Sequence, residues 1–293
     1  MVRKLGLLGS LYLAQGLPYG FFTQALPAML RQQGVSLEGI GLASLLALPW
    51  GLKFLWAPAV DRLGWARIGR RRSWILPLQA AAAATLLGLA TVDPRGQLEA
   101  VLAGVLLINL IAATQDIATD GLAVTILSAS ERGLGNGVQV AGYRLGMIVG
   151  GGALLVVFDR LGWATIFALM AGLLALASLP ILAFREPPPP PAEPRGSAWA
   201  ALRGFLDRPG TGAWLAAIAA FKAGEHFATA MLKPMLVDRG LDLEAIGWLL
   251  GTAGFVASFV GALAGGALVG RIGRERSLGI FGALQAVAVG AYA

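Results

Sequence analysis

The stretch "ATQDIATDGLAVTIL" runs from Ala113 to Leu127 and closes an apolar segment that begins near Leu98. Such a segment is long enough to cross a bilayer, because about 20 mostly apolar residues span the hydrocarbon core. It nevertheless carries Asp116 and Asp120, one helical turn apart. A carboxylate deep in a membrane costs several kcal/mol unless another group answers it. We therefore expect neighbouring helices to bring partners to these two acids.

The composition of the whole chain indicates a polytopic membrane protein. Of 293 residues, 57% are hydrophobic and only 13% are charged, whereas soluble domains carry about 25% charged residues. The net charge of +7 does not favour nucleic-acid binding, because the basic residues cluster between apolar segments, as the positive-inside rule expects. The absence of cysteine excludes disulfides and any cysteine-based metal or redox centre.

Hydropathy predicts an all-α membrane protein with eight or nine spanning helices. We place them at residues 5–30, 37–60, 73–92, 98–127, 135–158, 163–184, 211–236 and 244–270, with a ninth that begins near Ser277. Five arginines lie between the second and third helices, whereas loops on the other side, such as "DPRGQLE", are neutral to acidic. The N-terminus and the arginine clusters are therefore predicted to lie in the cytoplasm.

Two runs of sequence indicate that the chain contains two related halves. "MLRQQGVSLEGIG" starts at Met29 and "MLVDRGLDLEAIG" starts at Met235, with Met, Leu, Gly, Leu, Glu, Ile and Gly in the same register. Between the halves lies "REPPPPPAEPRGS", which cannot span a membrane, followed by the amphipathic "AWAALRGFLDR", typical of a helix at the membrane surface. We expect a first half at 1–184, a linker at 185–210 and a second half at 211–293 that is truncated inside its third helix.

The loop "DRLGWARIGRRR" resembles the signature between the second and third helices of the major facilitator superfamily. Five further runs, "LKFLWAPAVDR", "GRRRSW", "ATQDIATD", "ERGLGNGVQVAGYRLGM" and "FKAGEHFA", resemble the AmpG-like muropeptide permeases, and the related acetyl-coenzyme A transporters share much of this pattern. The resemblance implies two six-helix halves and proton-driven import of anhydromuropeptides across the bacterial cytoplasmic membrane, or of another solute such as acetyl-coenzyme A. It implies no cofactor, and it implies a switching role for the loop residues Asp61, Arg62, Gly69, Arg70 and Arg71.

Depth along the helices predicts which charges meet inside the membrane. At about 1.5 Å per residue, Asp116 lies roughly 18 Å from the cytoplasmic end of its helix, Arg144 roughly 15 Å, and Asp120 and Lys53 roughly 12 Å. Asp116 and Asp120 fall on one helix face, within reach of Arg144 and Lys53. From the matched depths we predict that Asp116 pairs with Arg144, and that Asp120 releases the coupling proton. The same charges could instead form neutral ion pairs that only hold helices together.

The candidate substrate and proton pathway collects the polar residues of the predicted spans. Its members are Gln15, Tyr19, Lys53, Gln115, Asp116, Asp120, Tyr143, Arg144, Lys222, Glu225 and His226. No metal site is expected. Gly142, Gly146 and Gly150 have the small-residue spacing of a close helix contact, which would let the fifth helix rock.

Two other classes of function remain to be weighed against transport. A membrane-embedded transferase is disfavoured, because the chain has no Cys, a single His and no G-x-S-x-G element. The membrane part of an ATP-driven pump would need a separate ATPase subunit, because no G-x-x-x-x-G-K-[ST] loop occurs. The sequence does not fix the oligomeric state.

Overall fold

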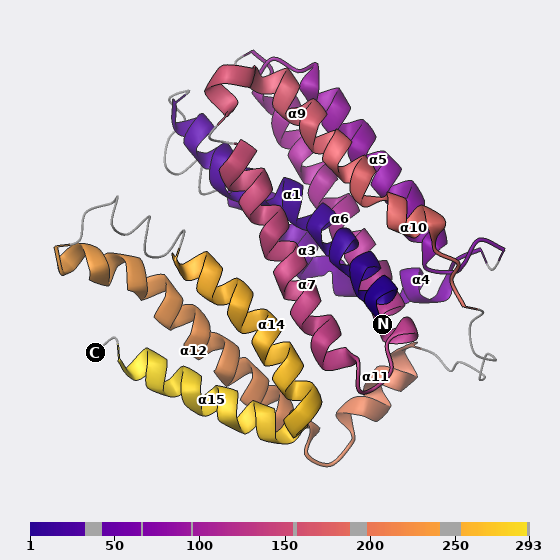
Figure 1. Cartoon of the computed structure of the whole chain (residues 1–293), viewed down its shortest axis with the longest axis vertical. Coiled ribbons are helices and arrows are strands. Elements are labelled where there is room, and N and C mark those ends of the chain that lie inside the picture. Colours follow the sequence, from indigo (N-terminus) through magenta and orange to yellow (C-terminus); the bar gives the residue numbers. More distant parts are fainter. Residues whose placement is uncertain are drawn as a thin grey trace. The chain divides into compact units, whose positions relative to one another are not determined.

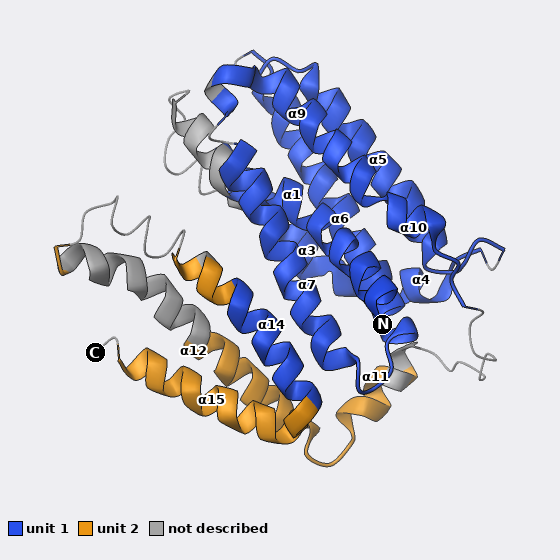
Figure 2. Ribbon diagram, viewed as in Figure 1, with its two compact units in different colours: residues 1–188, 259–270 blue, residues 189–258, 271–293 orange. Residues whose placement is uncertain are grey.

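The computed structural model describes residues 1–293 except 33–42, 66, 95, 155–156, 188–197, 241–252 and 292–293. Every regular element in the described part is a helix (Figure 1), which confirms the expected all-α class. The chain divides into two compact units, residues 1–188 with 259–270 and residues 189–258 with 271–293 (Figure 2). The candidate site lies in the first of these units.

Most helices agree with the predicted spans in position. The first unit contains α1 (Val2–Gln32), α5 (Arg72–Ala90), α6 (Leu98–Ile126), α7 (Arg132–Met147), α9 (Phe158–Ala177) and α10 (Leu179–Ala183). The remaining long helices are α12 (Thr211–Asp238), α14 (Gly254–Ile272) and α15 (Arg274–Gly290), and the short helix predicted after the proline run is α11 (Ala198–Leu206). Within the described residues, the segments 72–90, 98–126 and 160–183 are long and apolar enough to cross a membrane.

The second predicted helix, 37–60, is not one continuous helix over its described part. It is divided into η1 (Ser44–Ala47), α3 (Leu48–Leu52), η2 (Lys53–Leu55) and α4 (Ala57–Arg62). Pro49 and Pro58 stand in the first turns of α3 and α4, where proline is tolerated because those N–H groups lack helical partners. The described part of the predicted second span is thus helical, but it is divided into short segments.

Two further spans also depart from a simple helix. The fifth continues from α7 into a π-helical turn, η3 (Ile148–Ala153), and the sixth begins earlier than predicted, at Phe158. Gly162 interrupts α9 with φ +75°, a left-handed conformation that favours glycine. The sixth span then divides at Ser178, where Pro180 stands in the first turn of α10.

Helix α6 lies at the centre of the first unit. In its most apolar window 61% of the residues are buried, compared with 28% for α5. At one end of the unit, Phe21 packs edge-on against Phe167, with the ring centroids 5.1 Å apart. Toward the other end, Leu8, Leu11 and Leu122 form a second buried cluster. Four polar residues of α6, Asn109, Gln115, Asp116 and Thr119, are therefore enclosed by protein.

The start of α1 is tied to the loop between α6 and α7. Lys4 Nζ lies 3.0 Å from Glu131 Oε2, and the backbone N–H of Ser128 donates to the same oxygen at 2.9 Å. The Ser128 N–H, and after it Lys4, lower the pKa of Glu131 to about 2. Glu131 is therefore ionised at neutral pH and can hold both partners.

Glycine brings α1 and α7 into backbone contact. A Cβ added to Gly142 would lie 2.8 Å from the carbonyl oxygen of Gly9, and one added to Gly20 would lie 2.5 Å from Met147 Cα. Cβ atoms on Gly16 and Gly146 would also meet the opposing backbone well inside van der Waals contact. The close contact predicted for the glycines of the fifth helix is confirmed.

We predict that Gly16→Ala destabilises the first unit, whereas Gly6→Ala on the same helix does not. An added methyl at Gly16 meets the backbone of α7, and overpacking of this kind costs about 1–3 kcal/mol. Nothing lies within 4 Å of a Cβ at Gly6, so alanine there should be neutral or slightly stabilising. Thermal unfolding in detergent measures both variants, and equal melting temperatures would contradict this packing.

Candidate functional site

The carboxylate of Asp116 is paired with Lys53 from the broken second span. Lys53 Nζ binds Asp116 Oδ2, and the two side chains are 31% and 10% exposed. The prediction that Asp116 pairs with Arg144 was therefore wrong. Arg144 is half-buried on α7 and forms no ion pair in the part of the chain that the structure describes.

Asp120 is held by neutral donors rather than by a cation. The hydroxyl of Tyr12 donates to Asp120 Oδ1 at 2.7 Å, and Gln139 Nε2 donates to the same oxygen at 3.3 Å. The two donors come from α1 and α7, so both helices converge on this side chain of α6. The two acids of α6 thus have different partners.

The broken second span is pinned to α6 by three side-chain donors. The indole N–H of Trp50 donates to Asn109 Oδ1 at 3.0 Å, and that of Trp56 donates to Thr114 Oγ1 at 3.1 Å. Lys53 supplies the third contact, to Asp116. In the low dielectric of a membrane interior, such polar contacts hold a segment that lacks a continuous helical ladder.

An aromatic cluster adjoins the ion pair. The ring centroid of Tyr19 lies 5.7 Å from that of Trp50 and 5.6 Å from that of Tyr143, and Trp50 and Tyr143 are 6.2 Å apart. Lys53 Nζ lies 5.6 Å from the Trp50 ring centroid, within the range of a cation–π interaction. The three aromatic side chains and Lys53 are all half-buried. The cluster therefore presents aromatic rings and a positive charge at a partly open surface.

A cleft connects the polar centre, the surroundings of Asp116 and Asp120, to the basic loop. This loop joins α4 to α5 and carries Arg67, Arg70 and Arg71. The volume of the cleft is about 570 Å³. The charged residues that line it are Lys53, Asp61, Arg70, Arg71 and Asp120. Asp120 can therefore be reached from the end of the bundle that carries the arginines.

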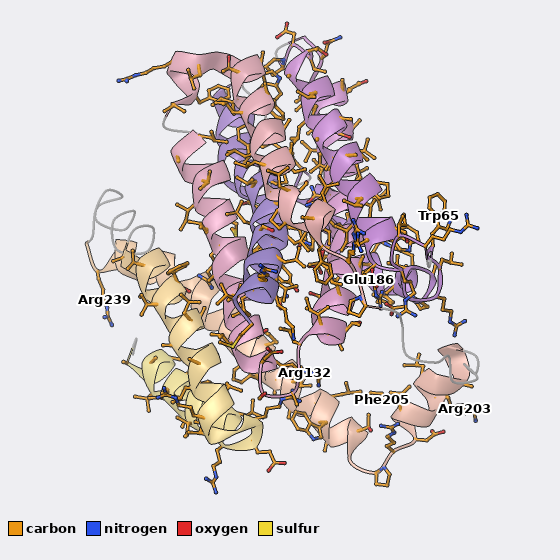
Figure 3. The ribbon with its side chains drawn as sticks, turned by 45° about the vertical axis from the view of Figure 1, so that its right-hand side comes forward. Trp65, Arg132, Glu186, Arg203, Phe205 and Arg239 are labelled. Carbon is orange, nitrogen blue, oxygen red and sulfur yellow. The ribbon has the colours of Figure 1, made fainter. Side chains whose placement is uncertain are left out.

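The basic loop lies beside Glu186, which stands three residues after the end of α10 in the sequence (Figure 3). Glu186 accepts hydrogen bonds from the backbone N–H groups of Arg71 and Arg72, at 2.9 and 3.0 Å. It thereby caps α5, whose first N–H groups have no helical acceptor. Gly69 has φ +101°, and a Cβ there would lie 2.7 Å from Glu186 Cβ, so this position requires glycine for two reasons.

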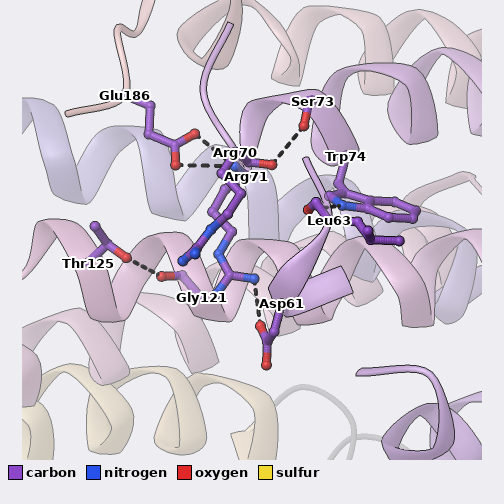
Figure 4. A network of polar contacts seen from close by, with 9 residues as sticks. All are labelled: Asp61, Leu63, Arg70, Arg71, Ser73, Trp74, Gly121, Thr125 and Glu186. Carbon is purple, nitrogen blue, oxygen red and sulfur yellow. Dashed lines mark hydrogen bonds and ion pairs between the residues drawn. The ribbon is translucent and has the colours of Figure 1, made fainter. Parts of the chain in front are cut away.

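Arg71 reaches from this loop to both α4 and α6. Its Nη1 lies 2.6 Å from Asp61 Oδ1 (Figure 4), and the residue is only 7% exposed. A Cβ on Gly121 would lie 2.6 Å from Arg71 Nε. The Arg71 guanidinium therefore occupies the space that a side chain at position 121 of α6 would fill.

The structure brings many predicted site residues together in the first unit. Gln15 Nε2 donates to Thr119 Oγ1 at 3.3 Å, and Gln115 is buried nearby on α6. Arg62 is exposed at the end of α4. Lys222 stands on α12 in the second unit, and the side chains of Glu225 and His226 lie outside the described ones. Within the described part of the chain, no group of His, Cys, Asp and Glu could hold a metal ion.

Several residues of the site were missed by the sequence analysis. Tyr12 precedes Gln15 by three residues and Tyr19 by seven, so helical spacing places all three on one face. Gln139 and Tyr143 are likewise four residues apart. Glu186, by contrast, contacts a loop more than a hundred residues away, and local sequence carries no signal for such a contact.

We predict that Asp116→Asn destabilises the protein by about 3 kcal/mol, because Lys53 loses its partner in a low-dielectric setting. This is the lower end of the usual cost, since Lys53 is partly exposed. A second change, Lys53→Gln, should restore most of the loss. The matched control is Arg144→Gln, which should restore none. Thermal unfolding of the single and double variants measures this coupling, and rescue by Arg144→Gln alone would contradict the pairing.

Comparison with known proteins identifies the family. The sequence profile of the Major Facilitator Superfamily matches residues 8–293. The anhydromuropeptide permease of Escherichia coli (strain K12) is 35% identical over 284 residues, which are 95% of this chain and 58% of the permease. An uncharacterised protein of Haemophilus influenzae is 34% identical over 94% of this chain and 67% of its own length.

A third relative lies outside the bacteria. An uncharacterised membrane protein of Saccharomyces cerevisiae is 35% identical over 163 residues, which are 48% of this chain and 29% of that protein. The present chain thus spans less than two thirds of the Escherichia coli permease, and nearly all of it takes part in that match. From the profile match and the helical fold, the chain is an integral membrane protein that belongs to the major facilitator superfamily.

Proposed function

We propose that the chain is part of a secondary active transporter that imports anhydromuropeptides, coupled to protons, across the bacterial cytoplasmic membrane. The observation that carries this proposal is the Lys53–Asp116 ion pair beside an aromatic cluster on the central helix of an apolar bundle. Ionisable groups inside a membrane are costly and mark substrate or ion pathways. The name of the Escherichia coli relative supports the substrate.

The chemistry of the site suits a ligand with a sugar and a peptide. Aromatic faces such as those of Trp50, Tyr19 and Tyr143 can stack on the apolar face of a sugar ring. A peptide carboxylate needs a cation, and Arg144 is half-buried without an ion pair among the described residues. In this proposal Arg144 binds the carboxylate of the peptide ligand. Lys53 either keeps its ion pair with Asp116 or leaves Asp116 to bind the ligand.

Asp120 is the proposed site of proton exchange. Its partners, Tyr12 and Gln139, are neutral, so loss or gain of a proton leaves no opposite charge stranded. It also lines the cleft that reaches the basic loop, which gives a proton a path to one side of the membrane. Lys222, Glu225 and His226 are proposed to complete the pathway from the second half.

The basic loop is proposed to control switching between inward- and outward-facing states on the cytoplasmic side. Asp61 and Arg71 join α4 to the start of α5, and Glu186 joins that start to the end of α10. Asp61, Arg71 and Glu186, together with Arg62, Gly69 and Arg70, can therefore hold α4, the start of α5 and the end of α10 together or release them. The N-terminus then lies in the cytoplasm, and the halves are 1–184 and 211–293 with a linker at 185–210.

We predict that Asp120→Asn separates binding from proton-driven uptake. The variant keeps a side chain that can accept from Tyr12, so it should bind labelled anhydromuropeptide normally and exchange it in counterflow. It should lose accumulation driven by a pH gradient, because the amide cannot titrate. The measurement uses vesicles that carry the protein, and Asp207→Asn, at a 72% exposed carboxylate, is the control.

Two outcomes would contradict the proposal. Normal accumulation with a normal pH dependence in Asp120→Asn would show that another group carries the proton. Equal competition by acetyl-coenzyme A for labelled anhydromuropeptide would show that the substrate assignment is wrong, whichever residue couples the proton.

A further inference from the structure

An apolar groove lies outside the polar centre, where the basic loop meets α5. Its volume is about 450 Å³, comparable with that of one fatty-acyl chain, and its main lining residues are Leu63, Gly64, Trp65, Trp74, Pro77 and Ala81. None of these residues lines the cleft that reaches Asp120. The groove is therefore a separate feature of the first unit.

Hydrogen bonds hold the walls of the groove in place. Trp74 Nε1 donates to the carbonyl of Leu63 at 2.9 Å, and the backbone N–H of Trp65 donates to Ser73 Oγ at 3.1 Å. Ser73 in turn donates to the carbonyl of Arg70 at 2.7 Å. Because the polar atoms of both walls are satisfied by the protein, the surface left to a ligand is apolar.

The groove faces away from the protein within the first unit. Trp65 is 74% exposed and Leu63 is 59% exposed, and Trp65 projects from the edge of the unit (Figure 3). Pro77 and Ala81 are exposed on α5, the helix of which only 28% of the apolar window is buried. Exposed tryptophan beside an apolar helix face is typical of the boundary between lipid chains and headgroups.

The charge beside the groove selects the kind of ligand. Arg71 is engaged by Asp61, and Arg72 donates to the carbonyls of Ile181 and Leu182 at the end of α10. Arg67, two residues after Trp65 in the same loop, is exposed and has neither an ion pair nor a hydrogen bond among the described residues. An exposed cation in the loop that forms one wall of an apolar groove favours an amphiphile with an anionic head.

We propose that this groove binds one anionic phospholipid of the leaflet on the basic side of the protein. One acyl chain lies along Trp74, Pro77 and Ala81, Trp65 covers it near the headgroup level, and Arg67 binds the phosphate. The site is independent of the transported substrate. Because the same loop carries Arg71, the lipid also supports the segment that binds Asp61.

Native mass spectrometry of the purified chain tests this site. Phosphatidylglycerol and phosphatidylcholine with identical acyl chains are titrated onto the protein, and the retained lipid is counted. We expect one tightly retained phosphatidylglycerol, held about fivefold more strongly than phosphatidylcholine, from about 1 kcal/mol per basic residue near a membrane surface. Arg67→Gln should abolish that preference, and Ala81→Phe, which fills the groove, should abolish retention of both lipids.

The matched control is Leu87→Phe, on the same helix and 51% exposed but outside the groove lining, and it should retain lipid like the wild type. Equal retention of the two lipids by the wild type, or unchanged retention in Ala81→Phe, would overturn the proposal. A second measurement uses phosphatidylglycerol with brominated chains, which should quench the tryptophan fluorescence of the wild type more than brominated phosphatidylcholine does, and more than it quenches that of Trp65→Phe. Quenching that is equal for the two lipids, or unchanged in Trp65→Phe, would also overturn it.

Discussion

A carboxylate on the central helix of an apolar bundle needs an ion-pair or hydrogen-bond partner from the protein itself. The arrangement of the first unit depends on that requirement. Asp116 is 7% exposed on α6, the most enclosed of the apolar spans. The second span is divided into short segments with prolines at 49 and 58. It places Trp50, Lys53 and Trp56, spaced three residues apart, on three acceptors of α6. The ion pair and the two indole hydrogen bonds thus join the divided second span to α6.

The two acids of α6 meet this requirement with different partners. Asp116 has a cation, so removal of its charge leaves Lys53 uncompensated in a medium of low dielectric. Asp120 has a phenol and an amide as partners, so removal of its charge leaves neither partner with an uncompensated charge. Glycine allows this centre to be compact, because α1 and α7, which carry Tyr12 and Gln139, approach to backbone contact. The polar centre and the glycine contact therefore belong to one packing arrangement.

Much of this fold could be predicted from the sequence, because apolar length and loop charge are local properties. The helices at 98–126 and 72–90 fall within two residues of their predicted ends, and the need for partners at Asp116 and Asp120 followed from burial alone. Lys53 was one of two basic residues expected within reach of these acids, but the choice of Lys53 rather than Arg144 for Asp116 did not follow from the sequence. Depth counted at about 1.5 Å per residue assumes straight helices, whereas 3-10 turns rise about 2 Å per residue, and η2 begins at Lys53 itself. The cap by Glu186 and the space at Gly121 depend on contacts distant in sequence.

The most direct test of this account is a distance measurement on the intact ion pair. Solid-state NMR of the protein in membranes, with 15N in the lysine side chains and 13C in the aspartate carboxyls, detects a lysine Nζ beside an aspartate Cγ. We expect such a dipolar coupling in the wild type, and we expect it to disappear in Lys53→Gln and in Asp116→Asn but to remain in Arg144→Gln. With 15N in the arginine side chains instead, a coupling to the Asp116 carboxyl that is lost in Arg144→Gln would contradict the account.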